Sequence, residues 1–482
     1  MARICSSLPL LCTTLIAACT IPGSLFAVDS SDGDLKVVVA LFRHGVRAPL
    51  ETFGKNAGKH SKEAWPDLKK DWHVCPDCWG YLTPQGSDAA RVLGAYYGDY
   101  YSKNAWPTNF KVYIWADVDQ RTRATAEALC EGIQSAGASA QVQSRQPTDA
   151  PDPLFHPFKA NCGEPDAKHL EAIAAYINEN LPGWIREFTY PTHGDQLNDL
   201  YTVLGCDDIK HCKPLSQLAD HAIAWSPSTA TPTPRPTSPI IWEGQFPYAS
   251  SATEAFLLKY ASDMDIDKIG WGRVVDKQTG DTDMLSKLLR LHDFYFDKTE
   301  RDLNHDAPDL YLAGIQGSNL VREIRDQLNK VVRKAPPGDC PRPSGQSQFV
   351  GFIGHDTNLA NVQTLLNVKW RFDGDQQLPA GMRKLPGNDA LPAGALVFEL
   401  RQTASSDYKV RIQYVTQSLE QMRAPREQDQ PYRVFTTCGG DNGKEISPCE
   451  MSLETFNATV GKVVETYKEF LSHCQGDKQV CP

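Results

Sequence analysis

The chain has 482 residues, of which 41% are hydrophobic and 22% charged, and its formal net charge at pH 7 is -10. Its basic residues are scattered and form no stripe that would bind nucleic acid, and beyond the N-terminus no apolar run is long enough to span a bilayer. The composition also excludes collagen-like, coiled-coil and wholly disordered chains. We therefore expect a soluble, acidic, monomeric globular protein, with about three domains or one large α/β unit carrying insertions.

Residues 1–27 have the layout of a secretory signal peptide. Arg3 is the only charge near the start, and Leu8–Cys19 is an apolar stretch too short to cross a membrane as a helix. Two processing routes are open: cleavage after Ala27, which is slightly favoured, and a bacterial lipoprotein box that would place a lipid anchor on Cys19. Removing residues 1–27 takes away one positive charge and makes the net charge -11. We expect a protein exported to the periplasm or secreted by a bacterium.

Cysteine usage agrees with export. Of the 14 cysteines three lie in residues 1–27, and the remaining eleven are many for a reduced cytosolic protein. A short C-x-x-C loop is predicted to close on itself rather than to hold zinc, because no second such pair supplies the other ligands. The expected local disulfides are Cys75–Cys78, Cys206–Cys212 and Cys438–Cys449. Because eleven is odd, at least one thiol stays free, and we predict Cys130.

Three continuous apolar runs with β-branched residues predict strands that are buried on both faces. They are Lys36–Phe42, Phe110–Ala116 and Phe349–Ile353, and the last two are each followed by a helical pattern. Two further strands are predicted at Ala395–Leu400 and Tyr408–Val415. Strands that alternate with helices in this way indicate an α/β sheet.

Helical patterns dominate the stretch between the second and third predicted strands. They cover Asp166–Asn180, Ala252–Ser262, Asp283–Phe296 and Gly317–Lys334, and a proline-rich loop lies at Ser226–Pro239. We therefore predict that residues 28–160 and 341–482 form an α/β core. Residues 161–340 form a smaller, mainly α cap domain inserted into it.

Polar side chains follow three of the predicted strands at the point where each strand ends. They are Arg43, His44 and Arg47 after the first strand, Asp117 and Arg121 after the second, and His355 and Asp356 after the third. In an open α/β sheet ligands bind beyond the carboxyl ends of the strands. If these side chains converge, they form a site with three arginines, two histidines and two aspartates.

Such a site suits a phosphate ester. Guanidinium groups match phosphate oxygens in pairs and stay charged at any working pH. A histidine can attack phosphorus and carry the phosphoryl group covalently, and an aspartic acid can protonate the leaving oxygen and later activate water. The arginines supply the positive charge that a metal would otherwise give, so no metal and no cofactor are expected. Each residue alone has an ordinary structural explanation, and the specificity lies in the combination.

The segment Phe42–Pro49 resembles the RHGxRxP signature of the histidine acid phosphatases, and Gly354–Asn358 resembles their second, HD signature. Further stretches are similar to landmarks of the bacterial phytase and glucose-1-phosphatase group, so that the resemblance covers the whole mature chain. They are Leu82–Gly86, Ala116–Arg123, Asp152–Phe155, Gly270–Arg273, Leu396–Glu399 and Gln421–Arg423.

The resemblance implies roles for the matching residues. His44 would be the nucleophile that forms a phosphohistidine, and Asp356 the proton donor. Arg43, Arg47, Arg121 and His355 would hold the phosphate, and Asp117 would border the same pocket. The implied fold is a mixed, mainly parallel sheet flanked by helices, with a smaller α domain and the substrate in the cleft between them.

The resemblance leaves the substrate open between phytate and sugar phosphates. Phytases normally continue the first signature with Thr-Lys, and that lysine contacts distal phosphates of the substrate, but this chain has Leu50 and Glu51 there. A carboxylate at that place weakens the attraction of a highly anionic ester. His292 falls where phytases keep a histidine that contacts the substrate. The alternatives are a phosphoglycerate-mutase relative and a weakly active phosphate-ester-binding protein that kept the fold; His44 and Asp356 favour an enzyme.

Overall fold

The computed structural model describes residues 33–107, 109–144, 150–190, 195–206, 212–226, 235–301, 310–333, 347–373, 376–439 and 445–474. The predicted signal peptide, both processing sites and most of the proline-rich loop lie outside these ranges. Among the described residues no helix is both long and apolar enough to cross a membrane.

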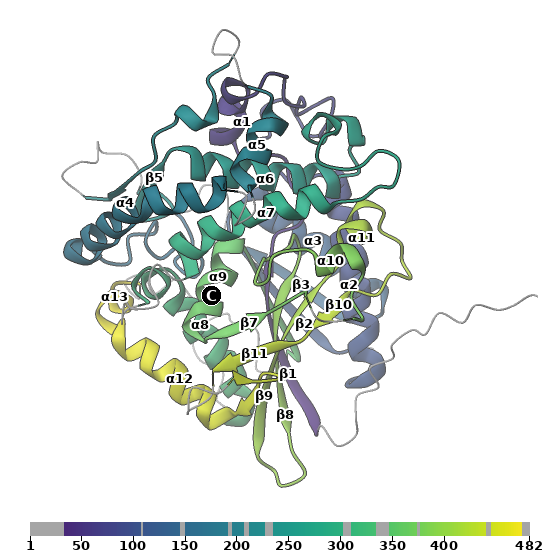
Figure 1. Cartoon of the computed structure of the whole chain (residues 1–482). Helices are drawn as coiled ribbons and strands as arrows, with labels where there is room; N and C mark the ends of the chain where they lie inside the picture. The colour runs from purple at the N-terminus through teal and green to yellow at the C-terminus, as the bar shows by residue number, and fades with distance from the viewer. Residues whose placement is uncertain are drawn as a thin grey trace, which may run out of the picture.

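The centre of the molecule is a mixed eight-stranded sheet (Figure 1). Its parallel half runs in the order β1 (Asp34–Arg43), β6 (Phe349–Gly354), β2 (Lys111–Ala116) and β3 (Ser139–Ser144). The antiparallel half continues from the other edge of β1 through β8 (Ala395–Gln402), β9 (Tyr408–Thr416) and β10 (Tyr432–Val434), with β13 (Glu450–Ser452) also on β9. The expected mixed α/β sheet is confirmed, and the five predicted strands are β1, β2, β6, β8 and β9.

Two small sheets accompany the large one. β7 (Val368–Trp370), β11 (Thr436–Gly439) and β12 (Glu445–Ile446) form a three-stranded antiparallel sheet. β4 (His221–Ala224) and β5 (Ile240–Glu243) form a hairpin-like pair.

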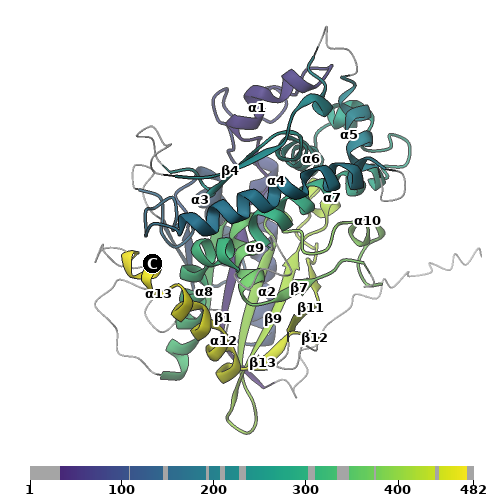
Figure 2. The same ribbon diagram turned by 60° about the vertical axis from the view of Figure 1, so that its left-hand side comes forward.

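Residues Val37–Phe42 of β1 are all apolar because helices cover both faces of the sheet. Val38, Ala40 and Phe42 pack into a core with α2 (Pro84–Asn104) and α3 (Gln120–Ser135). The alternate residues Val37, Val39 and Leu41 belong to a second core, on the face covered by α8 (Tyr311–Arg333), α9 (Asp356–Leu365) and α12 (Leu453–Thr466). Side chains that alternate across a strand therefore build a three-layer core (Figure 2).

A group of helices lies beyond the carboxyl end of β1 (Figure 1). It contains α1 (Glu51–Ala57), α4 (Ala167–Thr189), α5 (Gln196–Leu204), α6 (Gln245–Ala261) and α7 (Asp283–Phe296). The predicted helix at 166–180 is longer than expected, because α4 continues through Pro182. The division into a core and a 161–340 cap stays a prediction; α8, inside that range, packs on β1, α9 and α12. Three short α-helices follow later in the chain. They are α10 (Ala380–Arg383), α11 (Leu419–Arg423) and α13 (Lys468–His473).

The predicted local disulfides are present. Cys75–Cys78, Cys206–Cys212 and Cys438–Cys449 are bonded, and Cys130 is free and buried. A further bond, Cys162–Cys474, joins positions 312 residues apart and could not be read from local spacing. The two remaining cysteines, Cys340 and Cys481, lie outside the described residues.

Helix α6 buries a lysine. Lys259 is fully buried, its Nζ donates to the Lys268 carbonyl at 3.3 Å, and it lies 4.0 Å from the centre of the Trp65 ring. No carboxylate among the described residues forms an ion pair with it. Burial therefore lowers the pKa of Lys259 well below the ordinary 10.5, with Asp71 opposing this only in part.

We expect Lys259→Met to stabilise the fold, increasingly so as the pH falls. Because the unfolded lysine takes up its proton at a higher pH than the folded one, the wild type loses stability as the pH falls through the window below 10.5. The methionine variant lacks this penalty. The free energy of unfolding of the variant should exceed that of the wild type at both pH about 9 and pH about 6. The difference should grow as the pH falls, to about 1–3 kcal/mol at the lower pH. Lys268→Met, at a half-exposed lysine beside it, should show no such growth; equal pH profiles for all three proteins would contradict the argument.

Candidate active site

The register of the parallel strands brings the predicted site residues together. Arg43 pairs with Gly354 across β1 and β6, and Ala116 pairs with Ile353 across β2 and β6, so all three strands end at one level. The chain leaves each strand through a backbone hydrogen bond to β6: His44 N donates to Gly354 O at 2.9 Å, and Asp117 N to Ile353 O at 3.0 Å. The side chains that follow the three strands therefore meet at one edge of the sheet.

His44 is buried, and its ring is fixed with one nitrogen free. Its Nδ1 lies 2.8 Å from the Gly45 carbonyl oxygen, which can only accept, so Nδ1 carries the proton and Nε2 keeps its lone pair. Burial lowers the pKa of His44 well below 6.5, and the positive charges of Arg121, Arg43 and Arg47 lower it further. The ring therefore stays neutral, and able to act as a nucleophile, under acidic conditions.

Arg43 and Arg47 share a buried carboxylate that the sequence did not reveal. Arg47 Nη2 donates to both oxygens of Glu254, at 3.0 and 2.9 Å, and Arg43 also contacts Glu254. Arg43 Nη2 lies 2.8 Å from Asp356 Oδ2, and its Nη1 donates to the Ala390 carbonyl at 2.7 Å. Burial opposes ionisation of Glu254, but Arg47 and Arg43 outweigh it and hold its pKa below the usual value. Both guanidiniums are thus aimed at negative charge.

His355 lies between Arg121 and Asp117. Arg121 Nη2 is 3.3 Å from His355 Nδ1, and a guanidinium can only donate, so the proton of a neutral His355 is on Nε2. That nitrogen is 2.8 Å from Asp117 Oδ2. The same carboxylate oxygen lies 2.9 Å from His156 Nε2, and Asp119 pairs with Arg121 at 2.7 Å. Two histidines therefore share one buried carboxylate.

Asp117 contacts the two histidines of the cluster through its carboxylate. It is fully buried, and although burial opposes ionisation, His156 and His355 hold its pKa far below the usual value. Its carboxylate is turned to the two histidines. A direct contact between Asp117 and phosphate stays a prediction, and the observed contacts suit a residue that fixes the ring of His355.

Asp356 is the first residue of helix α9. Its Oδ1 accepts from the backbone N–H of Thr357 at 2.9 Å, while Oδ2 faces Arg43. Burial alone would raise the pKa of Asp356, but Arg43, His292 and Arg47 lower it to about 2. The positive end of the α9 helix dipole also favours an anion at this place.

The residues that are predicted to affect substrate choice lie around this cluster. His292 is buried on α7, its Nδ1 lies 2.8 Å from Ser250 Oγ, and it lies near Glu254 and Asp356. A side chain at Gly80 would come near both Leu50 and Arg121, so Leu50 lies close to Arg121. Glu51 follows it as the first, exposed residue of α1. The segment that departs from the phytase pattern therefore lies beside the site.

Two groups of described side chains are spaced closely enough to share a cation. They are Asp117, Asp119, His156 and His355, and Glu254, His292 and Asp356. In the first group both histidine nitrogens already face Asp117, and in the second both carboxylates face arginines. Both groups are explained by hydrogen bonds and ion pairs. That the reaction needs no metal stays a prediction, which a chelator can test.

Comparison with known proteins decides the family. A model of the histidine phosphatase superfamily (branch 2) matches residues 34–415. The chain belongs to this superfamily. Phytase AppA of Escherichia coli (strain K12) is 29% identical over 411 residues, which cover 83% of this chain and 85% of the relative. The glucose-1-phosphatase of Salmonella typhimurium (strain LT2) is 24% identical over 431 residues, covering 86% and 89%.

Solved structures give the same result for this histidine phosphatase. The Hafnia alvei phytase in complex with tartrate has a TM-score of 0.71 and 25% identity, covering 93% of this chain and 100% of that chain. The same phytase in complex with myo-inositol hexakis sulphate has a TM-score of 0.70 and 26% identity, with the same coverage. The predicted family and fold are thus confirmed, and the protein is a hydrolase of phosphomonoesters.

Proposed function

We propose that this histidine phosphatase is an exported acid phosphatase that works through a phosphohistidine at His44. One observation carries the proposal: a buried histidine with a free Nε2 stands among three arginines, at the same strand ends as the aspartate that could serve as acid. Arg43, Arg47, Arg121 and His355 would hold the phosphate oxygens. Glu254, which neutralises Arg43 and Arg47 here, would give up these contacts when a phosphate enters.

The proposed reaction has two steps. His44 Nε2 attacks phosphorus while the bond from phosphorus to the ester oxygen breaks, and Asp356 gives its proton to that oxygen. Water then attacks the phosphohistidine, Asp356 takes a proton from it, and phosphate leaves with His44 restored. The low pKa of Asp356 belongs to the site without ligand. A bound phosphate would neutralise Arg43 and Arg47, and its negative charge would raise the pKa of Asp356 toward that of a working acid.

Asp117 and His156 would act behind this centre. We infer that Asp117 holds the Nε2–H tautomer of His355 and so keeps the His355 ring in place between Arg121 and the substrate. His156 Nε2 faces the same oxygen of Asp117 and keeps that carboxylate from turning. In this proposal Asp117 and His156 are positioning residues, and they do not touch the phosphate.

We propose export, as a periplasmic or secreted protein, with phytate or sugar phosphates as substrates. The apolar N-terminal segment and the disulfides support export. A phytase and a glucose-1-phosphatase among the relatives support the substrate classes. The first test is phosphate release from phytate, glucose 1-phosphate and p-nitrophenyl phosphate at pH about 5, with and without a chelator. Release from at least one ester supports the proposal. No release from folded protein would favour a phosphate-ester-binding protein instead.

The charge at position 51 should tune the choice between these substrates. We expect Glu51→Lys to lower the KM for phytate about threefold to tenfold and to leave glucose 1-phosphate nearly unchanged, because the lysine attracts distal phosphates. The effect should fade at high ionic strength. Glu454→Lys makes the same charge change at an exposed position on α12 and should leave both KM values unchanged. An equal effect on the two substrates would show that position 51 does not face distal phosphates.

A further inference from the structure

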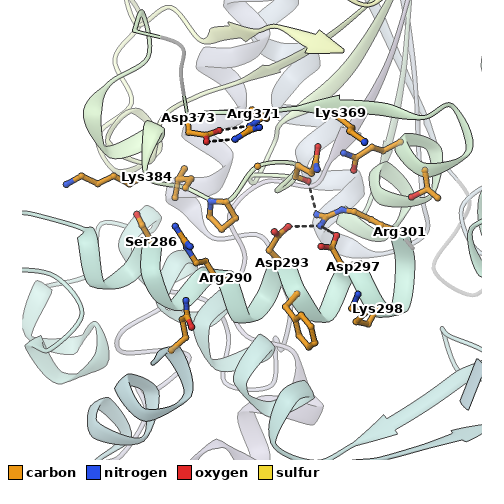
Figure 3. Close-up of a pocket in the computed structure, with 18 of the residues that line it drawn as sticks. Ser286, Arg290, Asp293, Asp297, Lys298, Arg301, Lys369, Arg371, Asp373 and Lys384 are labelled. Carbon is orange, nitrogen blue, oxygen red and sulfur yellow. Dashed lines mark hydrogen bonds and ion pairs between the residues drawn. The ribbon is translucent and has the colours of Figure 1, made fainter. Parts of the chain in front are cut away.

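A large groove lies apart from the catalytic groups (Figure 3). It has a volume of about 1760 Å³ and separates one face of α7 from a wall made by β7, Arg371, Asp373 and residues 383–388. None of the arginines, histidines or carboxylates of the active site lines it. Typical sites for small ligands have about 300–1,000 Å³, so the groove has room for a multiply substituted ring.

The groove is positively charged in an acidic protein. Lys and Arg supply eight of its 29 lining residues, against 49 of 482 in the whole chain, and six lining residues are acidic. Four of the basic residues belong to residues 287–301 and four to residues 369–384, so both walls carry positive charge. The groove thus has an excess of two positive charges in a chain of net charge -10.

Some of the positive charge on both walls is not held in an ion pair, although, besides Arg371, Arg290 also helps to lower the pKa of Asp373. Among the described residues no carboxylate forms an ion pair with Arg290 or Lys298 on the α7 side. On the facing wall Arg383 donates to the uncharged amide of Gln376 at 2.7 Å. Other basic residues are neutralised, for example Arg371, which pairs with Asp373 at 2.6 Å (Figure 3). Unpaired charges of one sign that face each other across a groove repel, and a multiply charged anion between them relieves that repulsion.

A buried hydroxyl adds an unused donor to the groove. Ser286 lies on the α7 wall, is 2% exposed, and its Oγ has no hydrogen-bond partner among the described residues. The net charge of the groove also becomes more positive in acid, because Asp293 then takes up a proton. Burial, together with Asp297 and Asp389, raises the pKa of Asp293 to about 7 in spite of Arg301. Hydroxyl, guanidinium and ammonium donors on facing walls suit phosphate oxygens.

We propose that this groove is a binding site for multiply phosphorylated small molecules, distinct from the catalytic site around His44. A compound with several phosphates can reach both walls at once, whereas inorganic phosphate can reach only one. The site therefore selects polyphosphorylated compounds over orthophosphate, and it lies on the same molecule as a centre that hydrolyses phosphate esters.

Calorimetric titration of the His44→Ala variant with myo-inositol hexakisphosphate tests this at low ionic strength. Two molecules should bind, one at the arginines of the catalytic site and one in the groove. The double substitution Arg290→Glu/Lys298→Glu, added to His44→Ala, should abolish the second binding event. The milder Arg290→Gln/Lys298→Gln pair should weaken it about tenfold or more. The control pair Lys69→Glu/Lys462→Glu makes the same charge change at exposed positions elsewhere, and this variant should keep both binding events.

A single binding event in the His44→Ala variant that excess inorganic phosphate abolishes, or two events that survive both groove double variants, would overturn the proposal. Inorganic phosphate in excess should displace the molecule at the catalytic site and leave the groove occupied. This result separates the two sites. Phosphate release by the wild type is measured independently. The groove proposal can therefore be disproved without disproving the proposed catalytic function.

Discussion

Replacing His44 with alanine is expected to lower kcat by about 10⁴-fold or more on every phosphate ester, because the side chain that forms the covalent intermediate is gone. The fold should survive. His44 follows the end of β1 rather than lying inside the strand, and among the described residues its ring forms a hydrogen bond only with the neighbouring Gly45 carbonyl. Circular dichroism and thermal unfolding check folding, and phosphate release checks turnover.

The same variant should still bind inorganic phosphate, because Arg43, Arg47, Arg121 and His355 remain. Loss of turnover with binding retained separates a missing nucleophile from a collapsed pocket. His169→Ala, at a partly exposed histidine on α4, is the matched control and should have wild-type turnover. Substantial phosphate release by folded His44→Ala protein would remove His44 from the mechanism.

Asp356→Asn should separate esters by their leaving groups. For glucose 1-phosphate, whose leaving oxygen needs a proton, kcat/KM should fall about 10²–10⁴-fold, the usual contribution of a general acid. For p-nitrophenyl phosphate it should change far less, since p-nitrophenolate leaves without a proton. Because kcat/KM reports only the steps up to the first irreversible one, the comparison isolates formation of the phosphoenzyme.

Glu254→Gln is the matched control for that experiment. It makes the same change from carboxylate to amide in the same cluster, at a group that contacts Arg43 and Arg47. Because Glu254 has no proposed proton-transfer role, its replacement should alter both esters by the same factor. If Asp356→Asn also changed both esters equally, Asp356 would be a structural partner of Arg43 and not the acid.

The strand ends and their chemistry could be predicted from sequence because each signal is local. An apolar run predicts a buried strand, and the polar residues that follow it must lie at its carboxyl end. The register of β1, β6 and β2 then brings His44, His355 and Asp117 to one level. Helix α7 was predicted with its observed ends, since its apolar residues keep a helical period from Asp283 to Phe296.

The missed features depend on contacts between distant parts of the chain. Glu254 stands 211 positions from Arg43, and its one local sign is a carboxylate directly before the apolar run Ala255–Leu258. His156 lies 39 positions from Asp117 in the sequence, and only the fold brings its Nε2 within hydrogen-bond distance of that carboxylate. Helix α2 was not predicted because glycines lower its helix propensity. They are needed because a Cβ on Gly94 would lie 2.2 Å from the Leu129 carbonyl oxygen of α3.

Identification of the phosphorylated residue tests the central claim most directly. Asp356→Asn protein would be mixed with p-nitrophenyl phosphate, quenched in alkali, which preserves phosphohistidine, and digested for peptide mass spectrometry. The loss of Asp356 slows attack by water, so the intermediate should accumulate with the phosphoryl group on His44. Label on any other residue, or continued turnover with no labelled peptide, would contradict the mechanism.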